Sequence, residues 1–176
     1  MTQYDVTRGV TSSNITLNNG DYIYVSAGGT VYGIVANSGG YVTVRGGVST
    51  GTVVNSSGSD AAYSGGGLIS SLLRGGEAAV FFGGVAINTV VSNGGQIVAF
   101  SNISANQLAA GQYVGSGGVA SGTVLSSGGV QKIFSGPLVT GTVVSSGGAT
   151  VMVLRGLGAT VTGLDTLVAQ GAIRST

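Results

Sequence analysis

Short hydrophobic stretches alternate with glycine-rich polar turns along the whole chain, and the alternation is regular. Pairs of glycines follow successive stretches about every nine residues, as at Gly65-Gly66, Gly75-Gly76 and Gly83-Gly84. Alternate turns mark a longer unit of 16 to 19 residues, which begins after Gly40, Gly58, Gly76, Gly95, Gly111, Gly129 and Gly148. A fixed period of this size is typical of solenoids, in which each repeat buries its core against its neighbours.

Each unit contains three short hydrophobic stretches. The first is β-branched and leads into a polar turn, and its copies occupy residues 33–40, 51–58, 88–95, 122–129 and 141–148. The second occupies residues 41–45, 59–64, 77–82, 96–101, 130–135 and 149–155. The third is shorter and occupies residues 48–50, 68–70, 85–87, 119–121 and 138–140. β-Branched residues suit pleated strands, and Gly and Asn tolerate positive φ at corners. The pattern therefore predicts three strands per unit.

This pattern predicts an all-β fold, a right-handed parallel β-helix of about eight coils with 18–19 residues and three short strands per coil. Right-handed connections dominate between parallel strands. Helices are disfavoured because an interior glycine costs a helix about 1 kcal/mol relative to alanine. We expect a single domain over residues 1–176, with repeats in 16–160. Residues 1–15 would cap or start the array, and 161–176 would form a cap or a truncated coil, because an open solenoid end exposes a pairing edge.

Two columns of stacked side chains are predicted from the repeat. An apolar column contains Val35, Val53, Val90, Leu108, Val124 and Val143. A second column contains Val44, Tyr63, Phe81, Phe100, Phe134 and Leu154. We interpret the aromatic ladder Tyr63, Phe81, Phe100 and Phe134 as part of the core, because valine and leucine fill the same slot. The alternative is a surface strip of aromatic rings that binds carbohydrate.

Composition narrows the functional classes. Glycine occupies 35 of 176 positions, but 43% of the residues are hydrophobic, which argues against a disordered linker. Six basic and five acidic residues give a net charge of +1, so the chain has no basic patch for nucleic acid or for a membrane surface. No apolar run approaches a membrane span, and no signal-peptide pattern opens the sequence. Without cysteine, disulfides and thiolate metal sites are excluded.

One unit departs from the repeat. Asn102-Ile103-Ser104-Ala105 stands where a Gly-Gly turn is expected, and the unit loses two or three residues. We expect a locally narrowed coil here, so that the 34 residues between Phe100 and Phe134 span two coils. The alternative is a functional notch.

The turns and strands together resemble a known family. Asn-Ser-Gly-Gly and Ser-Ser-Gly-Gly turns, followed by a further glycine pair and a Gly-Thr-x-Val strand, resemble the repeats of AIDA-type and antigen-43-like autotransporter adhesins. The resemblance covers residues 14 to 160 and begins with Thr16-Leu17-Asn18-Asn19-Gly20-Asp21. Family passengers are right-handed β-helices, which agrees with the fold expected from the repeat.

The resemblance implies a non-enzymatic adhesin passenger, exposed on the bacterial surface or secreted and anchored to the outer membrane through a parent protein. Such modules mediate adhesion, self-association, aggregation and biofilm formation, so the implied partners are other copies, a host receptor or a glycan. Some are O-glycosylated on serine by a dedicated glycosyltransferase. The serine turns are similar to those acceptor regions and contain Ser56, Ser57, Ser126, Ser127, Ser145 and Ser146. Serine also simply suits a turn.

Two other functions remain as alternatives. Many β-helices cleave polysaccharides with two nearby carboxylates, and Asp60 and Glu77 fall at nearly matching positions of adjacent coils. The chain has no histidine, however, and Arg74 could form an ion pair with either carboxylate, so we expect no catalytic, cofactor or metal site. The second alternative is ice binding by a threonine column, which contains Thr52, Thr89, Thr123 and Thr142 and is continued by Ser71.

Overall fold

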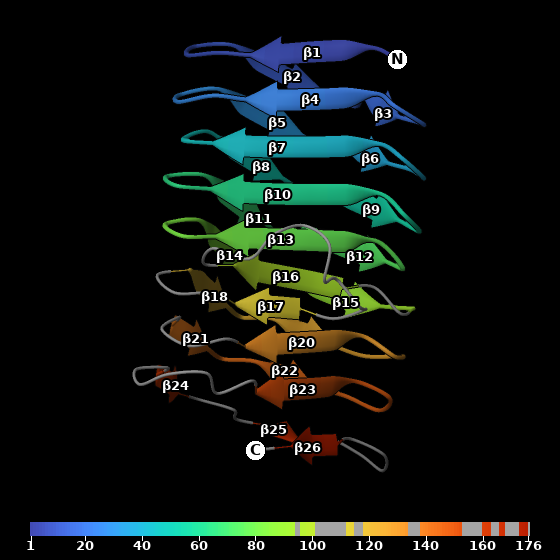
Figure 1. The fold of residues 1–176 in the computed structure, drawn as a ribbon, viewed down its shortest axis with the longest axis vertical. Coiled ribbons are helices and arrows are strands. Elements are labelled where there is room, and N and C mark those ends of the chain that lie inside the picture. The colour runs from blue at the N-terminus through green and yellow to red at the C-terminus, as the bar shows by residue number, and fades with distance from the viewer. Residues whose placement is uncertain are drawn as a thin grey trace.

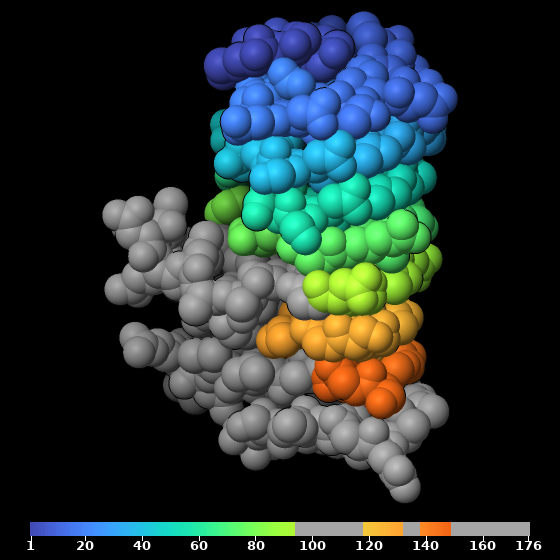
Figure 2. Space-filling view, turned by 90° about the vertical axis from the view of Figure 1, so that its right-hand side faces the viewer, coloured from blue at the N-terminus to red at the C-terminus, as the bar shows by residue number. Residues whose placement is uncertain are grey.

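The protein forms a parallel β-solenoid with three sheets, seen in a computed structural model that describes residues 1–93, 96–100, 112–114, 118–133, 138–152, 160–162, 166–167 and 173–175. Figure 1 shows the strands stacked in chain order from one end of the molecule to the other. In the space-filling view the coils of residues 1–93 form successive layers (Figure 2). The predicted fold class, an all-β parallel β-helix, is confirmed.

Within the described residues, sheet A contains ten strands, which are β1 (Gln3–Val6), β4 (Tyr22–Val25), β7 (Tyr41–Arg45), β10 (Ser59–Tyr63), β13 (Glu77–Phe81), β16 (Gln96–Phe100), β17 (Gln112–Val114), β20 (Val130–Ile133), β23 (Ala149–Met152) and β26 (Ile173–Ser175). The part of the chain that the structure describes contributes eight strands to sheet B, which are β2 (Thr11–Ser13), β5 (Thr30–Tyr32), β8 (Val48–Thr50), β11 (Gly67–Ile69), β14 (Val85–Ile87), β18 (Val119–Ser121), β21 (Leu138–Thr140) and β24 (Thr160–Thr162). Sheet C contains β3 (Thr16–Leu17), β6 (Val35–Ala36), β9 (Val53–Asn55), β12 (Leu72–Arg74), β15 (Val90–Ser92), β19 (Val124–Leu125), β22 (Val143–Val144) and β25 (Thr166–Leu167).

The core fills the inside of the coil. Side chains alternate between the two faces of a strand, so in β7 Val42 and Val44 are buried while Tyr41 and Arg45 are exposed. The inward residues of all three sheets form one continuous cluster, which includes Ile23, Val42, Leu68, Leu73, Val80, Val91 and Leu125. Burial of this cluster supplies the hydrophobic driving force for stacking.

The two glycines of a pair serve different purposes, as Gly39 and Gly40 show. Gly39 has φ of 71°, in the left-handed region that an L side chain rarely adopts. A Cβ on Gly40 would lie 2.6 Å from the carbonyl oxygen of Leu17 in the previous coil. The first glycine therefore turns the corner, and the second allows the next coil to approach closely.

The irregular unit differs from the sequence expectation. In sheets B and C, β14 pairs with β18 and β15 with β19, so Val85 is aligned with Val119 and Val90 with Val124. Residues that pair directly on neighbouring strands are thus 34 positions apart here, so this segment spans one coil and not two. Between β13 and β20, sheet A accommodates both β16 and β17. The prediction of a separate narrowed coil is therefore wrong. Leu108, which the sequence places in the apolar column of that coil, lies outside the described residues.

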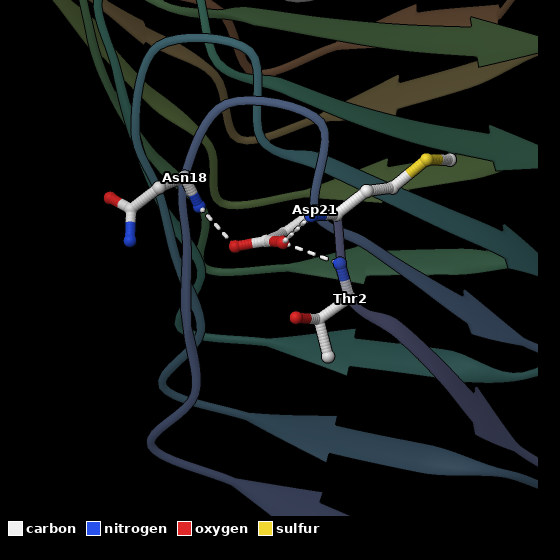
Figure 3. A network of polar contacts seen from close by, with 4 residues as sticks. Thr2, Asn18 and Asp21 are labelled. Atoms are coloured by element: carbon white, nitrogen blue, oxygen red, sulfur yellow. Dashed lines mark hydrogen bonds and ion pairs between the residues drawn. The ribbon is translucent and has the colours of Figure 1, made fainter.

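The first coil is tied to the second at its N-terminal end. Asp21 accepts hydrogen bonds from the backbone N–H of Thr2, at 2.6 Å, and of Asn18, at 3.2 Å (Figure 3). The terminal amino group lies 3.7 Å from the same carboxylate. These donors favour the charged form, so the N–H of Asn18 and then that of Thr2 lower the pKa of Asp21. Residues 3–6 and 11–13 already form regular strands of sheets A and B.

Candidate functional site

The outer face of sheet A carries most of the aromatic side chains of the described coils. Tyr22 and Tyr41 are aligned on neighbouring strands, as are Tyr24 and Thr43. Further along the same face lie Tyr63 on β10 and Phe81 on β13. These rings point away from the core because they alternate with buried residues such as Ile23, Val44, Ala62 and Val80.

The aromatic ladder is therefore not part of the core where it can be seen. Tyr63 and Phe81 stack with ring centroids 4.3 Å apart and an interplanar angle of 5°, and the Arg45 guanidinium lies 5.0 Å from the centre of the Tyr63 ring. Both rings are half-buried and cover Ala61 and Ala79 on the outer surface, separate from the inner core. The side chains of Phe100 and Phe134 lie outside the described part, although the backbone of Phe100 is aligned with Phe81.

The sequence pattern predicts the wrong face for the ladder because one turn is a residue short. Val44 is aligned with Ala62, and it is Arg45 that is aligned with Tyr63. Three positions separate Arg45 from Val48, whereas four separate their partners Tyr63 and Gly67. Counting back from the glycine pair therefore shifts the register by one, and a one-residue shift moves a side chain to the opposite face.

A second short turn creates a pocket at the edge of this face. Arg74 and Glu77 are three positions apart, whereas their partners Asn55 and Ser59 in the previous coil are four apart. The next coil again has four, from Ser92 to Gln96. At the short turn the surface is recessed into an open pocket of about 330 Å³, which is lined by Tyr41, Ser57, Gly58, Ser59, Gly75 and Glu77.

The two carboxylates proposed as a catalytic pair lie on opposite sides of sheet A. Glu77 is aligned with Ser59 and lines the outer pocket, while Asp60 is aligned with Ala78 and is completely buried inside the coil. Burial raises the pKa of both groups, and it raises that of Asp60 to about 7. The hydrogen bond from Ser71 acts in the opposite direction on the pKa of Asp60 and offsets part of the rise. The expectation that these carboxylates could meet is wrong, and among the described residues Arg74 forms an ion pair with neither of them, contrary to the expectation.

The threonine column also faces inward. Thr52, Ser71, Thr89, Thr123 and Thr142 are stacked on successive coils, as the backbone pairing of sheet C requires, and all are buried. Ser49 and Thr52 form a hydroxyl–hydroxyl hydrogen bond of 2.6 Å inside the coil. A surface that binds ice must be exposed to water, so these residues do not form one.

The valine column is stacked as predicted but faces outward over sheet C. Its described members alternate with buried partners; Val53, for example, precedes the buried Val54. Leu72 completes the series in the coil between Val53 and Val90. We call this surface the aliphatic stripe, and it consists of Val35, Val53, Leu72, Val90, Val124 and Val143. These side chains are half-buried, except that of Val90, which is 36% exposed.

The serine turns connect sheet C to sheet A along one corner of the rod. Ser56, Ser57, Ser127 and Ser146 are exposed, whereas Ser126 and Ser145 are half-buried. Each turn is closed by a backbone hydrogen bond, such as Gly58 N–H to Asn55 C=O at 2.8 Å. In the N-terminal coils an asparagine ladder runs along this corner, with bonds of 3.0 Å from Asn37 to Asn18 and 2.9 Å from Asn55 to Asn37.

The described residues contain no group of three or more His, Cys, Asp or Glu side chains that could hold a metal ion. They also contain no helix with the length and hydropathy of a membrane span.

Comparison with known proteins identifies a structural relative. The sequence matches no family model and none of the curated proteins. Among solved structures, the chain is similar to a crystal structure described as the TibC-catalysed hyper-glycosylated TibA55-350 fragment. The sequence identity is 29%, the TM-score is 0.56, and the match covers 99% of this chain and 71% of that chain.

Proposed function

We propose that this chain is a non-enzymatic adhesin passenger module of a bacterial cell surface, which acts by association with other copies or with a cell-surface receptor. The likeness to the TibA fragment supports this proposal, as does the resemblance of the repeats to AIDA-type passengers. The observation that carries self-association is the aliphatic stripe, because it is continuous over several coils and contains no charged residue.

The stripe suits contact between two rods. Each coil contributes one partly exposed aliphatic side chain to the stripe. Two rods in contact along several coils would therefore bury these side chains against each other in a regular row. Single contacts of this kind are small, but many acting together give a strong association. Because the chain carries so few charges, two rods approach with little electrostatic repulsion.

Bead aggregation with the purified rod tests self-association. We expect beads coated with the chain to aggregate, and we expect Val90→Lys to abolish aggregation because a charge in the contact would be desolvated. Ile87→Lys is the matched control, since Ile87 is 37% exposed but lies on sheet B. If the wild-type rod does not aggregate beads and binds no cell surface, the proposed function is wrong. If both lysine variants reduce aggregation equally, the stripe is not the contact.

We also propose that the serine turns accept O-linked sugars from a glycosyltransferase. The relative is a fragment glycosylated by TibC, and here serine turns recur along one exposed corner. Co-expression with TibC followed by peptide mass spectrometry tests this. We expect sugar on the exposed Ser56, Ser57, Ser127 and Ser146, and none on the half-buried Ser126 and Ser145. Modification that is equally frequent on the half-buried serines would contradict the proposal.

A further inference from the structure

The pocket beside Tyr41 and Glu77 arises from the order of side chains on three neighbouring strands. Tyr41, Ser59 and Glu77 are aligned on β7, β10 and β13. Strands in a sheet are about 4.8 Å apart, so the outer two backbones are separated by about 10 Å. The small Ser59 lies between them, and the turn residues Gly58 and Gly75 have no side chains to fill the space. A slot bounded by a ring and a carboxylate results.

The walls of the slot offer complementary chemistry. Tyr41 is 50% exposed and lines the pocket, so part of its ring is available to a ligand that has an apolar surface. Ser57 and Ser59 contribute hydroxyls, and Glu77 contributes a carboxylate that forms no ion pair with any residue of the described coils. A few polar groups beside an aromatic wall are typical of small-molecule sites.

We propose that this pocket binds a neutral pyranose unit of a glycan. The C–H face of the sugar ring would stack on Tyr41, while its hydroxyls donate to Glu77 and exchange hydrogen bonds with Ser59. No basic side chain lines the pocket, so a uronic or sialic acid would bring its carboxylate towards that of Glu77 without compensation. Charge complementarity thus selects neutral sugars over acidic ones.

This inference rests on the proposed adhesion role and makes it more specific, because it names neutral glycans as a class of binding partner beside other copies of the chain. The two activities use different surfaces. The pocket belongs to sheet A and its corner, whereas the aliphatic stripe lies on sheet C. Sugar binding can therefore be measured directly on the Val90→Lys variant, which we expect not to self-associate, and its failure is distinguishable from failure of self-association.

Saturation-transfer NMR with tetrasaccharides tests the proposal, with cellotetraose, chitotetraose and maltotetraose as neutral probes and a hyaluronan tetrasaccharide as the acidic one. We expect at least one neutral probe to bind with a dissociation constant of about 1 mM, the weak end of specific binding, since the pocket is open. Tyr41→Ala should weaken this at least tenfold, Glu77→Gln should weaken it several-fold, and Tyr41→Phe should retain it because the ring face is kept.

Tyr32→Ala is the matched control, since Tyr32 is 47% exposed but lies on sheet B. We expect it to leave binding unchanged. The proposal is overturned if none of the neutral probes binds, if the acidic probe binds most tightly, or if Tyr32→Ala weakens binding as much as Tyr41→Ala. Circular dichroism of each variant confirms that a loss of binding is not a loss of fold, and Tyr41→Phe remains informative if Tyr41→Ala does not fold.

Discussion

The Ser71 hydroxyl donates a hydrogen bond of 3.4 Å to Oδ2 of Asp60, inside the coil and away from solvent. Asp60 is aligned with Val42 and Ala78 on the neighbouring strands, so no charged side chain faces it from either one. An ionised carboxylate is unfavourable in such a place, which explains why burial raises its pKa from 3.8 to about 7.

This carboxyl makes the stability of the protein depend on pH. Between the two pKa values the folded chain holds a proton that the unfolded chain has released, so the free energy of unfolding falls as the pH rises. The contribution is fully present below about pH 4 and is lost as the pH passes about 7. At pH 8 we expect Asp60→Asn to be more stable than wild type by about 4 kcal/mol, from about 1.4 kcal/mol per pKa unit.

Urea unfolding of both proteins at pH 4, 6 and 8 measures this difference. The advantage of the Asn variant should shrink as the pH is lowered, because Asp60 itself becomes neutral. Asp5→Asn, at an exposed position of β1, is the control for removal of a carboxylate, and a surface substitution of this kind should change stability little. A difference between Asp60→Asn and wild type that does not vary with pH would contradict this explanation.

The glycine pairs give a second prediction, in which space rather than backbone conformation decides. Gly40 lacks a positive φ, but its Cβ would lie 2.6 Å from the Leu17 carbonyl oxygen. We expect Gly40→Ala to lower the free energy of unfolding by about 1–3 kcal/mol, as overpacking does. A Cβ on Gly67 would meet nothing within 4 Å, so Gly67→Ala should not destabilise the protein. Equal losses of stability in thermal unfolding of the two variants would contradict the close-approach argument.

The period of the chain could be predicted from the sequence because the corners need glycine, either for a positive φ or for the close approach of the next coil, and these glycines recur in the sequence. Which side chains point into the coil could not be predicted in the same way. In Thr52-Val53-Val54, Thr52 and Val54 point into the coil, and the apolar Val53 between them points towards solvent. Alternation alone does not say which set is inside when both contain β-branched residues. Only the pairing with neighbouring coils decides.

The candidate site could be predicted only in part. The exposed serine turns follow from their composition, but the pocket depends on a turn one residue shorter before Glu77 than before Ser59. The length of the repeat unit itself varies by several residues, so a turn that is one residue shorter does not stand out in the sequence. The sequence also predicts the step from β14 to β18 wrongly, because Gly95 and Gly111 divide the 34-residue segment at nearly the spacing of the repeat.

The inward threonines lead to two predictions of opposite sign. Oγ1 of Thr123 is buried without a hydrogen-bond partner among the described residues, whereas Oγ1 of Thr52 is 2.6 Å from the Ser49 hydroxyl. We expect Thr123→Val to stabilise the protein by about 1 kcal/mol, because a desolvated hydroxyl is replaced by a methyl group of similar size. Thr52→Val should destabilise it by about 1–3 kcal/mol, because Ser49 loses its partner. Chemical denaturation measures both, and the same sign for both would contradict this account.

The stacked rings of Tyr63 and Phe81 give the last prediction. Their centroids are 4.3 Å apart on adjacent strands, and aromatic pairs of this kind contribute about 0.5–1.5 kcal/mol beyond the area they bury. Leucine at either position keeps an apolar cover over Ala61 and Ala79 while removing the ring. A double-mutant cycle with Tyr63→Leu and Phe81→Leu should therefore show a coupling free energy of about 1 kcal/mol in urea unfolding. The control cycle combines Tyr63→Leu with Tyr32→Leu on sheet B, and it should show additive effects. If the two cycles give the same coupling, the stack adds nothing to the burial of the two side chains.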